Sequence, residues 1–141
     1  MNFVFDVDGT LTVHDSIVDI KFHDFFLDFV KKNNVYLASN KDYDTIVFQL
    51  GTDICNNVSG VYSDGGNYLH EKGSCIYQKE SRIKDKSIIA NAISAFVFFG
   101  DKIYVGGPDY SLALRANKFY SVTNYQETFD ILTQYYIKEI K

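Results

Sequence analysis

The sequence of 141 residues contains no tryptophan, one proline and two cysteines. Cys55 and Cys75 are isolated, so the sequence indicates neither a disulfide framework nor a cysteine-based metal site, and a reducing, cytoplasmic setting is expected. No apolar run approaches the length of a membrane-spanning helix. The chain reaches Asp6 too early for a secretory signal peptide. A membrane is therefore not an expected partner.

Clustered positive charge is also missing. The formal net charge is -4, and no stripe of lysine and arginine is visible. A protein that binds nucleic acid by neutralising phosphates needs such a stripe, so nucleic acid is not an expected partner either. The length and the 46% hydrophobic content suit one globular domain with a sizeable core. We predict a single domain over residues 1–141.

Short apolar runs alternate with segments of helical periodicity, which is typical of an α/β domain with a mainly parallel sheet. Strands are predicted at 2–5, 35–38, 61–63, 97–99 and 118–122, and a hairpin at 67–70 and 75–78. Helices are predicted at 18–32, at 43–50 before Gly51, at 88–96, and from a capping box at Asn124 and Glu127 to Tyr136.

The stretch Asn2–Thr12 (NFVFDVDGTLT) brings two carboxylates to the end of an apolar strand. Alternate residues of a strand point to the same side, so Asp6 and Asp8 are expected to act together. Two neighbouring carboxylates repel unless a cation or a shared proton intervenes, and oxygen ligands favour Mg²⁺. One aspartate can then attack phosphorus while the other moves a proton. The stretch therefore indicates phosphoryl chemistry.

Two other interpretations of this stretch are a solvated turn and a calcium loop. Asp and Gly after a strand are common in simple turns, so the first stays open. An EF-hand loop needs Gly sixth and Glu twelfth, and counted from Asp6 these positions hold Leu11 and Ile17. The calcium loop is excluded.

Further polar residues follow other predicted strands. In an open α/β sheet, ligands bind beyond the carboxyl ends of the strands. The second strand ends in Ser39 and Asn40, and the fourth is followed by Asp101 and then Asp109. The two acids alone can be ordinary loop carboxylates. Three strand ends that carry acids, a hydroxyl and an amide favour one shared site.

A phosphoryl site also needs a cation for the oxygens that the metal does not cover. Lys86, at the start of the helix before the fourth strand, is the preferred residue. Lys41, Lys84 and Lys102 remain alternatives.

Together these motifs resemble the haloacid dehalogenase superfamily, and more narrowly its eukaryotic phosphomannomutase branch. The resemblance is carried by Asp6–Thr10, Ser39, Asp85–Lys86, Phe98–Lys102 and Gly106–Tyr110, and by Val61–Gly73 and Tyr120–Thr123. It implies a Rossmann-like three-layer α/β/α core with a mainly parallel five-stranded sheet. A small β-hairpin, at about residues 60–79, would stand in place of a cap domain.

The resemblance also implies roles for the matching residues. Asp6 would be the nucleophile that forms an aspartyl-phosphate, and Asp8 the general acid/base, which also binds Mg²⁺ through its backbone carbonyl. Ser39 and Lys86 would hold the phosphoryl oxygens and complete the catalytic set. The expected metal residues are Asp6, Asp8, Asp101 and Asp109. Asp109 would either bind the metal directly or contact the residues that do. The expected substrate-binding residues are Gly9, Thr10, Ser39, Asn40 and Lys86.

Three features depart from the phosphomannomutase pattern. Those enzymes carry a cap domain between the hairpin and the lysine, whereas residues 78–84 bridge this gap directly here. His14 lies where they carry a phosphate-binding arginine nearby, and Pro108 replaces an asparagine. A closing lid or domain normally keeps water out of such a site. Without one, hydrolysis of the aspartyl-phosphate is the expected outcome.

The sequence thus predicts a Mg²⁺-dependent phosphatase that acts on a small phosphomonoester, sugar-like by resemblance. Two alternatives stay open: a phosphomutase whose lid comes from a partner subunit, and a non-catalytic binding module. Copies of the chain can also associate through the hairpin, or the hairpin can pack on its own sheet. The candidate contact residues are Tyr68, Leu69, Ile76 and Tyr77.

Overall fold

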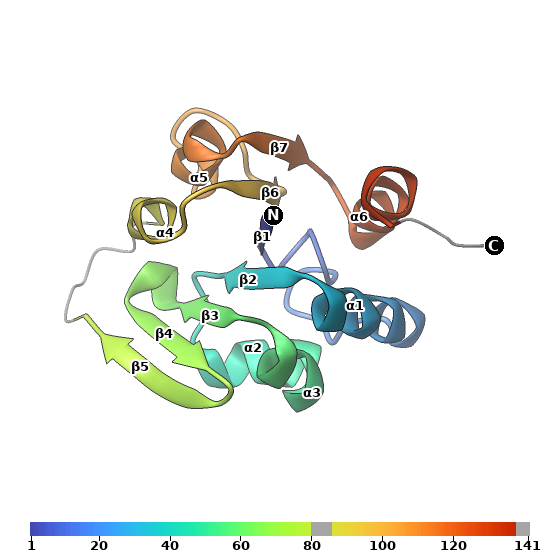
Figure 1. The fold of residues 1–141 in the computed structure, drawn as a ribbon, viewed down its shortest axis with the longest axis horizontal. Coiled ribbons are helices and arrows are strands. Elements are labelled where there is room, and N and C mark those ends of the chain that lie inside the picture. Colours follow the sequence, from blue (N-terminus) through green and yellow to red (C-terminus); the bar gives the residue numbers. More distant parts are fainter. Residues whose placement is uncertain (80–85, 138–141) are drawn as a thin grey trace.

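The computed structural model describes residues 1–79 and 86–137. They form a seven-stranded sheet with the strand order β5-β4-β3-β2-β1-β6-β7 and helices on both faces (Figure 1). The strands are β1 Asn2–Phe5, β2 Asn34–Ala38, β3 Gly60–Ser63, β4 Tyr68–Glu71, β5 Ser74–Gln78, β6 Phe96–Gly100 and β7 Lys118–Ser121. The α-helices are α1 Ile20–Lys32, α2 Tyr43–Leu50, α3 Thr52–Asn57, α4 Ser87–Ala92, α5 Tyr110–Arg115 and α6 Tyr125–Ile131.

Five neighbouring strands are parallel to one another: β3, β2, β1, β6 and β7. They confirm the predicted mainly parallel sheet. The predicted hairpin also forms, as β4 and β5. It does not stand apart from the sheet, because β4 pairs antiparallel with β3 and places Leu69 opposite Tyr62. The hairpin therefore extends the sheet by two strands, and β5 is its edge.

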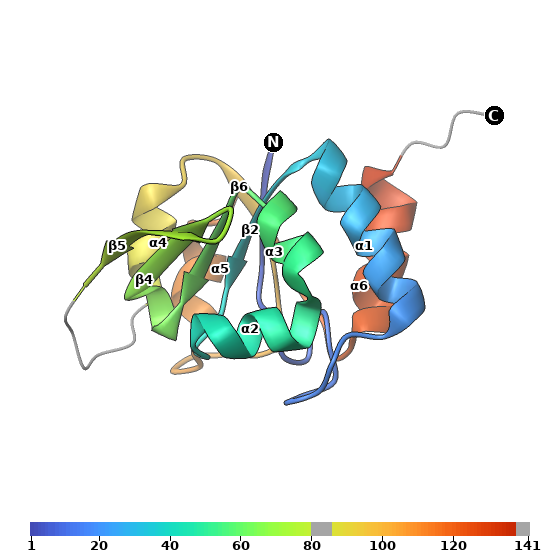
Figure 2. The same cartoon turned by 90° about the horizontal axis from the view of Figure 1, so that it is seen from below.

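Alternating residues of the central strands face the two helical layers. Phe3 and Phe5 belong to a core cluster with α1, α2 and α3, whereas Val4 belongs to a second cluster with α4 and α5. Figure 2 shows α4 and α5 on one side of the strands and α1, α3 and α6 on the other. This arrangement confirms the three-layer α/β/α architecture.

The helix predicted at 88–96 is shorter than its periodicity indicated. The helix α4 ends at Ala92, and Phe96 instead begins β6, where its N–H donates to Oδ1 of Asn117 at 3.0 Å. The terminal helix begins as expected, since Oδ1 of Asn124 accepts a hydrogen bond from the Glu127 N–H at 2.9 Å. It continues after α6 as a π-helical turn, Leu132–Tyr136.

The parallel register places the carboxyl ends of β1, β2 and β6 side by side. Phe5 pairs with Leu37 on one side and with Phe99 on the other. The next residue, Asp6, donates its N–H to the Phe99 carbonyl at 2.9 Å. The loops after β1 and β6 therefore emerge at one edge of the sheet, at the lower side of Figure 2. No helix in the described part of the chain is both long and apolar enough to cross a membrane.

Candidate active site

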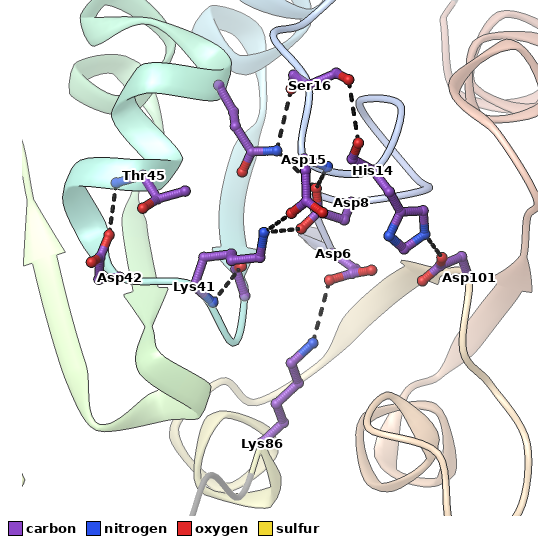
Figure 3. A network of polar contacts seen from close by, with 12 residues as sticks. Asp6, Asp8, His14, Asp15, Ser16, Lys41, Asp42, Thr45, Lys86 and Asp101 are labelled. Carbon is purple, nitrogen blue, oxygen red and sulfur yellow. Dashed lines mark hydrogen bonds and ion pairs between the residues drawn. The ribbon is translucent and has the colours of Figure 1, made fainter.

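A cavity of about 240 Å³ lies at this edge of the sheet. Its lining residues are Asp6, Asp8, His14, Asp15, Ser39, Asn40, Lys41, Lys86, Asp101, Lys102, Pro108 and Asp109. The structure thus brings together residues that follow β1, β2 and β6 and the residue that precedes α4 (Figure 3). Most of the residues that the sequence singled out lie in this one cavity.

The centre of the cavity is a buried ion-pair cluster. The Lys86 side chain is 3% exposed, and its Nζ lies 2.7 Å from Oδ1 of Asp109 and 3.3 Å from Oδ1 of Asp6. Asp109 is itself almost fully buried, and its Oδ2 accepts a hydrogen bond from the Lys102 N–H at 3.2 Å. An ammonium buried this deeply is stable only because two carboxylates face it.

The electrostatics of this cluster leave an excess of negative charge. Burial raises the pKa of Asp6 well above its ordinary value, against the attraction of Lys86, and the carboxylates of Asp109 and Asp101 raise it further. Burial opposes the charge of Lys86 as well, but Asp6 and Asp109 outweigh this effect and raise the pKa of Lys86. Lys86 therefore stays an ammonium, while Asp6 needs a further cation to be stable as a carboxylate.

The carboxylates fit a divalent metal ion. Asp6, Asp101 and Asp109 each offer an oxygen, and these oxygens lie within 4.8 Å of one another. Within the described ranges, Oδ1 of Asp101 is buried without a hydrogen-bond partner. A buried carboxylate oxygen that lacks a partner is costly unless a cation binds it. All-oxygen ligands are those that Mg²⁺ prefers, so the donor set suits that ion.

Asp8 lies in the same cavity but its carboxylate is outside the metal-ligand cluster. Its Oδ1 accepts hydrogen bonds from Nε2 of Gln49 at 2.8 Å and from the Asp15 N–H at 2.9 Å, and its Oδ2 lies 3.5 Å from Nζ of Lys41. Burial would raise the pKa of Asp8, but these three contacts outweigh it and lower that pKa. The strand β1 ends at Phe5, so the alternation expected to align the two aspartates does not extend to them.

The other predicted substrate-binding residues differ in their access to the cavity. Ser39 and Asn40 line it, and Oγ of Ser39 accepts the Lys41 N–H at 3.0 Å. Thr10 does not line it, because it is fully buried, and its carbonyl accepts the Thr128 hydroxyl at 2.7 Å. Gly9 is also outside the lining. It has φ +78°, and its Cα lies so close to the Asp101 carboxylate that an added Cβ would overlap it. For these two residues, substrate contact stays a prediction that the cavity does not support.

The four candidate lysines are now distinguished by position. Lys86 contacts Asp6 and Asp109, whereas Lys41 pairs with Asp8 and Asp15. Lys102 lines the cavity as well. Lys84 lies outside the described residues.

The sequence analysis missed the contacts that His14, Asp15 and Gln49 make in the site. His14 contributes Nε2 to Oδ2 of Asp101 at 2.8 Å, and Gln49 contacts Asp8 from α2. Nothing local indicates the His14 contact, because Asp101 is 87 residues away in the sequence. Gln49 did carry a signal, since it is a polar residue between Ile46 and Leu50 on the apolar side of a helix.

Comparisons with known proteins find similarity in structure. No family model and no curated protein matches the sequence. An IMP-bound mutant of the IMP-nucleotidase of Plasmodium falciparum is 13% identical and has a TM-score of 0.66, covering 94% of this chain and 67% of that one. An N-terminally truncated form is 14% identical, with a TM-score of 0.63, and covers 94% and 69%.

A third structure is similar over a smaller part. The trehalose-6-phosphate phosphatase of Aspergillus fumigatus is 20% identical over 65% of this chain and 32% of that one, with a TM-score of 0.43. The chain thus spans about two thirds of the nucleotidase and about a third of this phosphatase. At these identities the similarity concerns the fold.

Proposed function

Because the chain has the fold of haloacid dehalogenase superfamily phosphatases, we propose that it is a Mg²⁺-dependent phosphatase that hydrolyses a small phosphomonoester. One observation carries this proposal: the buried Asp6 contacts the Lys86 ammonium, and its carboxylate lies together with those of Asp101 and Asp109, with oxygens within 4.8 Å of one another. A purely structural ion pair of Lys86 with Asp6 and Asp109 would not require the additional acid at Asp101. Such an arrangement suits an anionic substrate whose charge a metal and a lysine share.

The proposed reaction uses these residues in two steps. A carboxylate oxygen of Asp6 attacks phosphorus, the bond from phosphorus to the ester oxygen breaks, and Asp8 gives its proton to the leaving oxygen. Water then attacks the aspartyl-phosphate while Asp8 accepts a proton from it, which releases phosphate and restores Asp6. Lys86 and Ser39 hold the phosphoryl oxygens throughout. Mg²⁺, held by Asp6, Asp101 and Asp109, would lower the charge repulsion between substrate and carboxylates.

Hydrolysis of the aspartyl-phosphate is favoured over transfer of its phosphoryl group to a second oxygen of the substrate, which is the reaction of a phosphomutase. Only seven residues, 79–85, separate β5 from Lys86. The cavity wall from Lys41 to Asp15 is partly open, since the Lys41 side chain is 36% exposed. Water can reach such a site, so the aspartyl-phosphate is expected to be hydrolysed.

The test is phosphate release from a panel of phosphomonoesters, with Mg²⁺ and with EDTA. Sugar phosphates belong in the panel, and so does IMP, the ligand bound to the nucleotidase of similar fold. We expect release that requires Mg²⁺ and is lost in Asp6→Asn but retained in the exposed control Asp28→Asn.

Full activity of Asp6→Asn would overturn the proposal. Isomerisation of a sugar phosphate without net phosphate release would instead identify a phosphomutase. Mg²⁺ binding without turnover on any member of the panel would identify a binding module.

A further inference from the structure

Gln49 is a buried polar residue on the apolar side of α2. It is 1% exposed, and its neighbours on the helix, Ile46 and Leu50, are core residues. Its Nε2 donates to Oδ1 of Asp8 at 2.8 Å and to the Ser16 carbonyl at 3.2 Å. One amide thus joins the interior of α2 to an acid of the site and to the loop after β1.

The chemistry of the partners fixes the orientation of this amide. Asp8 Oδ1 and the Ser16 carbonyl are both acceptors, so only the NH₂ group of Gln49 can face them. Both of its protons are then used. Its Oε1 is left buried without a hydrogen-bond partner among the described residues. An orphaned buried acceptor costs on the order of 1–3 kcal/mol, which an apolar side chain would avoid. Packing alone therefore does not explain a glutamine here.

The loop after β1, which Gln49 contacts, also contacts both Asp8 and Asp101. The Asp15 N–H donates to Oδ1 of Asp8 at 2.9 Å, and His14 contacts Asp101 at 2.8 Å. The main chain of Gln49 contributes a further tie, because its carbonyl accepts the Val18 N–H at 2.8 Å. The side chain and the main chain of Gln49 thus fix the start and the end of this loop.

These contacts leave the two oxygens of Asp8 in different environments. Two N–H donors, from Gln49 and Asp15, saturate Oδ1. Oδ2 is left on the cavity side, with Nζ of Lys41 at 3.5 Å. Oδ2 is therefore the Asp8 oxygen that neither Gln49 nor the Asp15 N–H contacts, and the one that can reach a substrate.

We propose that Gln49 is a positioning residue for proton transfer, which holds Oδ1 of Asp8 so that Oδ2 faces the leaving group. The inference rests on the phosphatase function proposed above. During transfer to Asp6, the Oδ2 proton moves to the ester oxygen as its bond to phosphorus breaks. During hydrolysis, Oδ2 takes a proton from water as the water oxygen bonds to phosphorus. Gln49 itself contacts neither the substrate nor the metal.

The dependence on the leaving group distinguishes this role from a structural one. An alkyl phosphate needs a proton on its leaving oxygen, whereas p-nitrophenyl phosphate releases a stable phenolate without one. The ratio kcat/KM covers only the steps up to phosphoryl transfer, so hydrolysis of the shared aspartyl-phosphate does not mask the difference. The variant Gln49→Met keeps the length of the side chain and removes both donors. Gln49→Leu serves as a second variant, and the exposed Gln134→Met as the control.

We expect Gln49→Met to lower kcat/KM for the alkyl phosphate about 100-fold, the scale of one general acid, and to change it only a few-fold for the aryl phosphate. The melting temperature with Mg²⁺ establishes that each variant is folded. Equal losses on both substrates, or no loss on either, in the folded variants would overturn the inference. A wild-type protein that turns over neither substrate would instead refute the phosphatase function.

Discussion

Removing the Lys86 ammonium tests whether the site carries excess negative charge. The variant Lys86→Met keeps the length of the side chain but leaves Asp6 and Asp109 facing each other without compensation. Breaking a buried ion pair by removing one partner costs about 3–5 kcal/mol, because the remaining charge is desolvated. For a domain of this size, 1 kcal/mol corresponds to a shift of about 4 °C in Tm. We therefore expect Tm to fall by roughly 12–20 °C in EDTA.

Two conditions should reduce this loss. Mg²⁺ supplies positive charge to the same carboxylates, so the difference from wild type should be smaller in Mg²⁺ than in EDTA. Acid should act in the same direction. The pKa of Asp6 is raised in the folded state, so on acidification Asp6 becomes neutral before an unfolded aspartate does. In the wild type this raised pKa makes stability fall as the pH rises above the ordinary value of 3.8.

Thermal unfolding by circular dichroism measures these effects. Lys32→Met is the matched control, since Lys32 pairs with Asp28 at 3.0 Å but both side chains are about two-thirds exposed. An exposed pair contributes at most about 1 kcal/mol, so this variant should melt close to wild type. If Lys86→Met melts like the control, or if its loss is the same with and without Mg²⁺, the assigned charge balance is wrong.

Three further predictions concern other parts of the structure. Hydrogen bonds to two aspartates raise the pKa of His23, so the stability that it contributes is present below pH 6.5 and is lost as the pH rises through the raised pKa. In urea unfolding, His23→Phe should therefore lose about 1 kcal/mol at pH 5.5 and less at pH 9. Equal losses at the two pH values would contradict this. A methyl group on Gly9 would overlap the Asp101 carboxylate, so Gly9→Ala should weaken Mg²⁺ binding at least about tenfold by calorimetry. Gly106→Ala has a similar positive φ but open space around the added methyl group, and should bind Mg²⁺ as wild type does. If copies associate through the edge strand β5, light scattering should show a dimer that Ile76→Lys dissociates; a monomeric wild type would refute this contact.

The sequence predicted the sheet and the residues of the site because both depend on local patterns. Apolar runs of four or five residues mark the strands, and a polar residue directly after each run lies at the carboxyl edge. Asp6, Ser39 and Asp101 could be placed in this way. The six-residue helices α3 and α5 were not predicted, whereas the equally short α4 was, because apolar residues continue its helical spacing to Phe96.

Contacts between segments that are distant in the chain could not be predicted from the sequence either. The hairpin was predicted, but its packing against β3 buries Leu69 and ties the Tyr77 hydroxyl to the Gly66 carbonyl at 2.9 Å. Of the four candidate contact residues, Ile76 alone is more than half exposed. The environment of Asp8 likewise depends on Gln49, which is 41 residues away. Such pairings are fixed by tertiary packing, which no local pattern encodes.

The central claim is that Asp6 carries the phosphoryl group during turnover. Its direct test is acid quenching of the protein during turnover of an aryl phosphate with Mg²⁺, followed by peptide mass spectrometry. The account predicts a phosphoryl group on the peptide that contains Asp6, and its absence in Asp6→Asn. Phosphate release at the wild-type rate with no phosphorylated aspartate, or with the group on another residue, would contradict it.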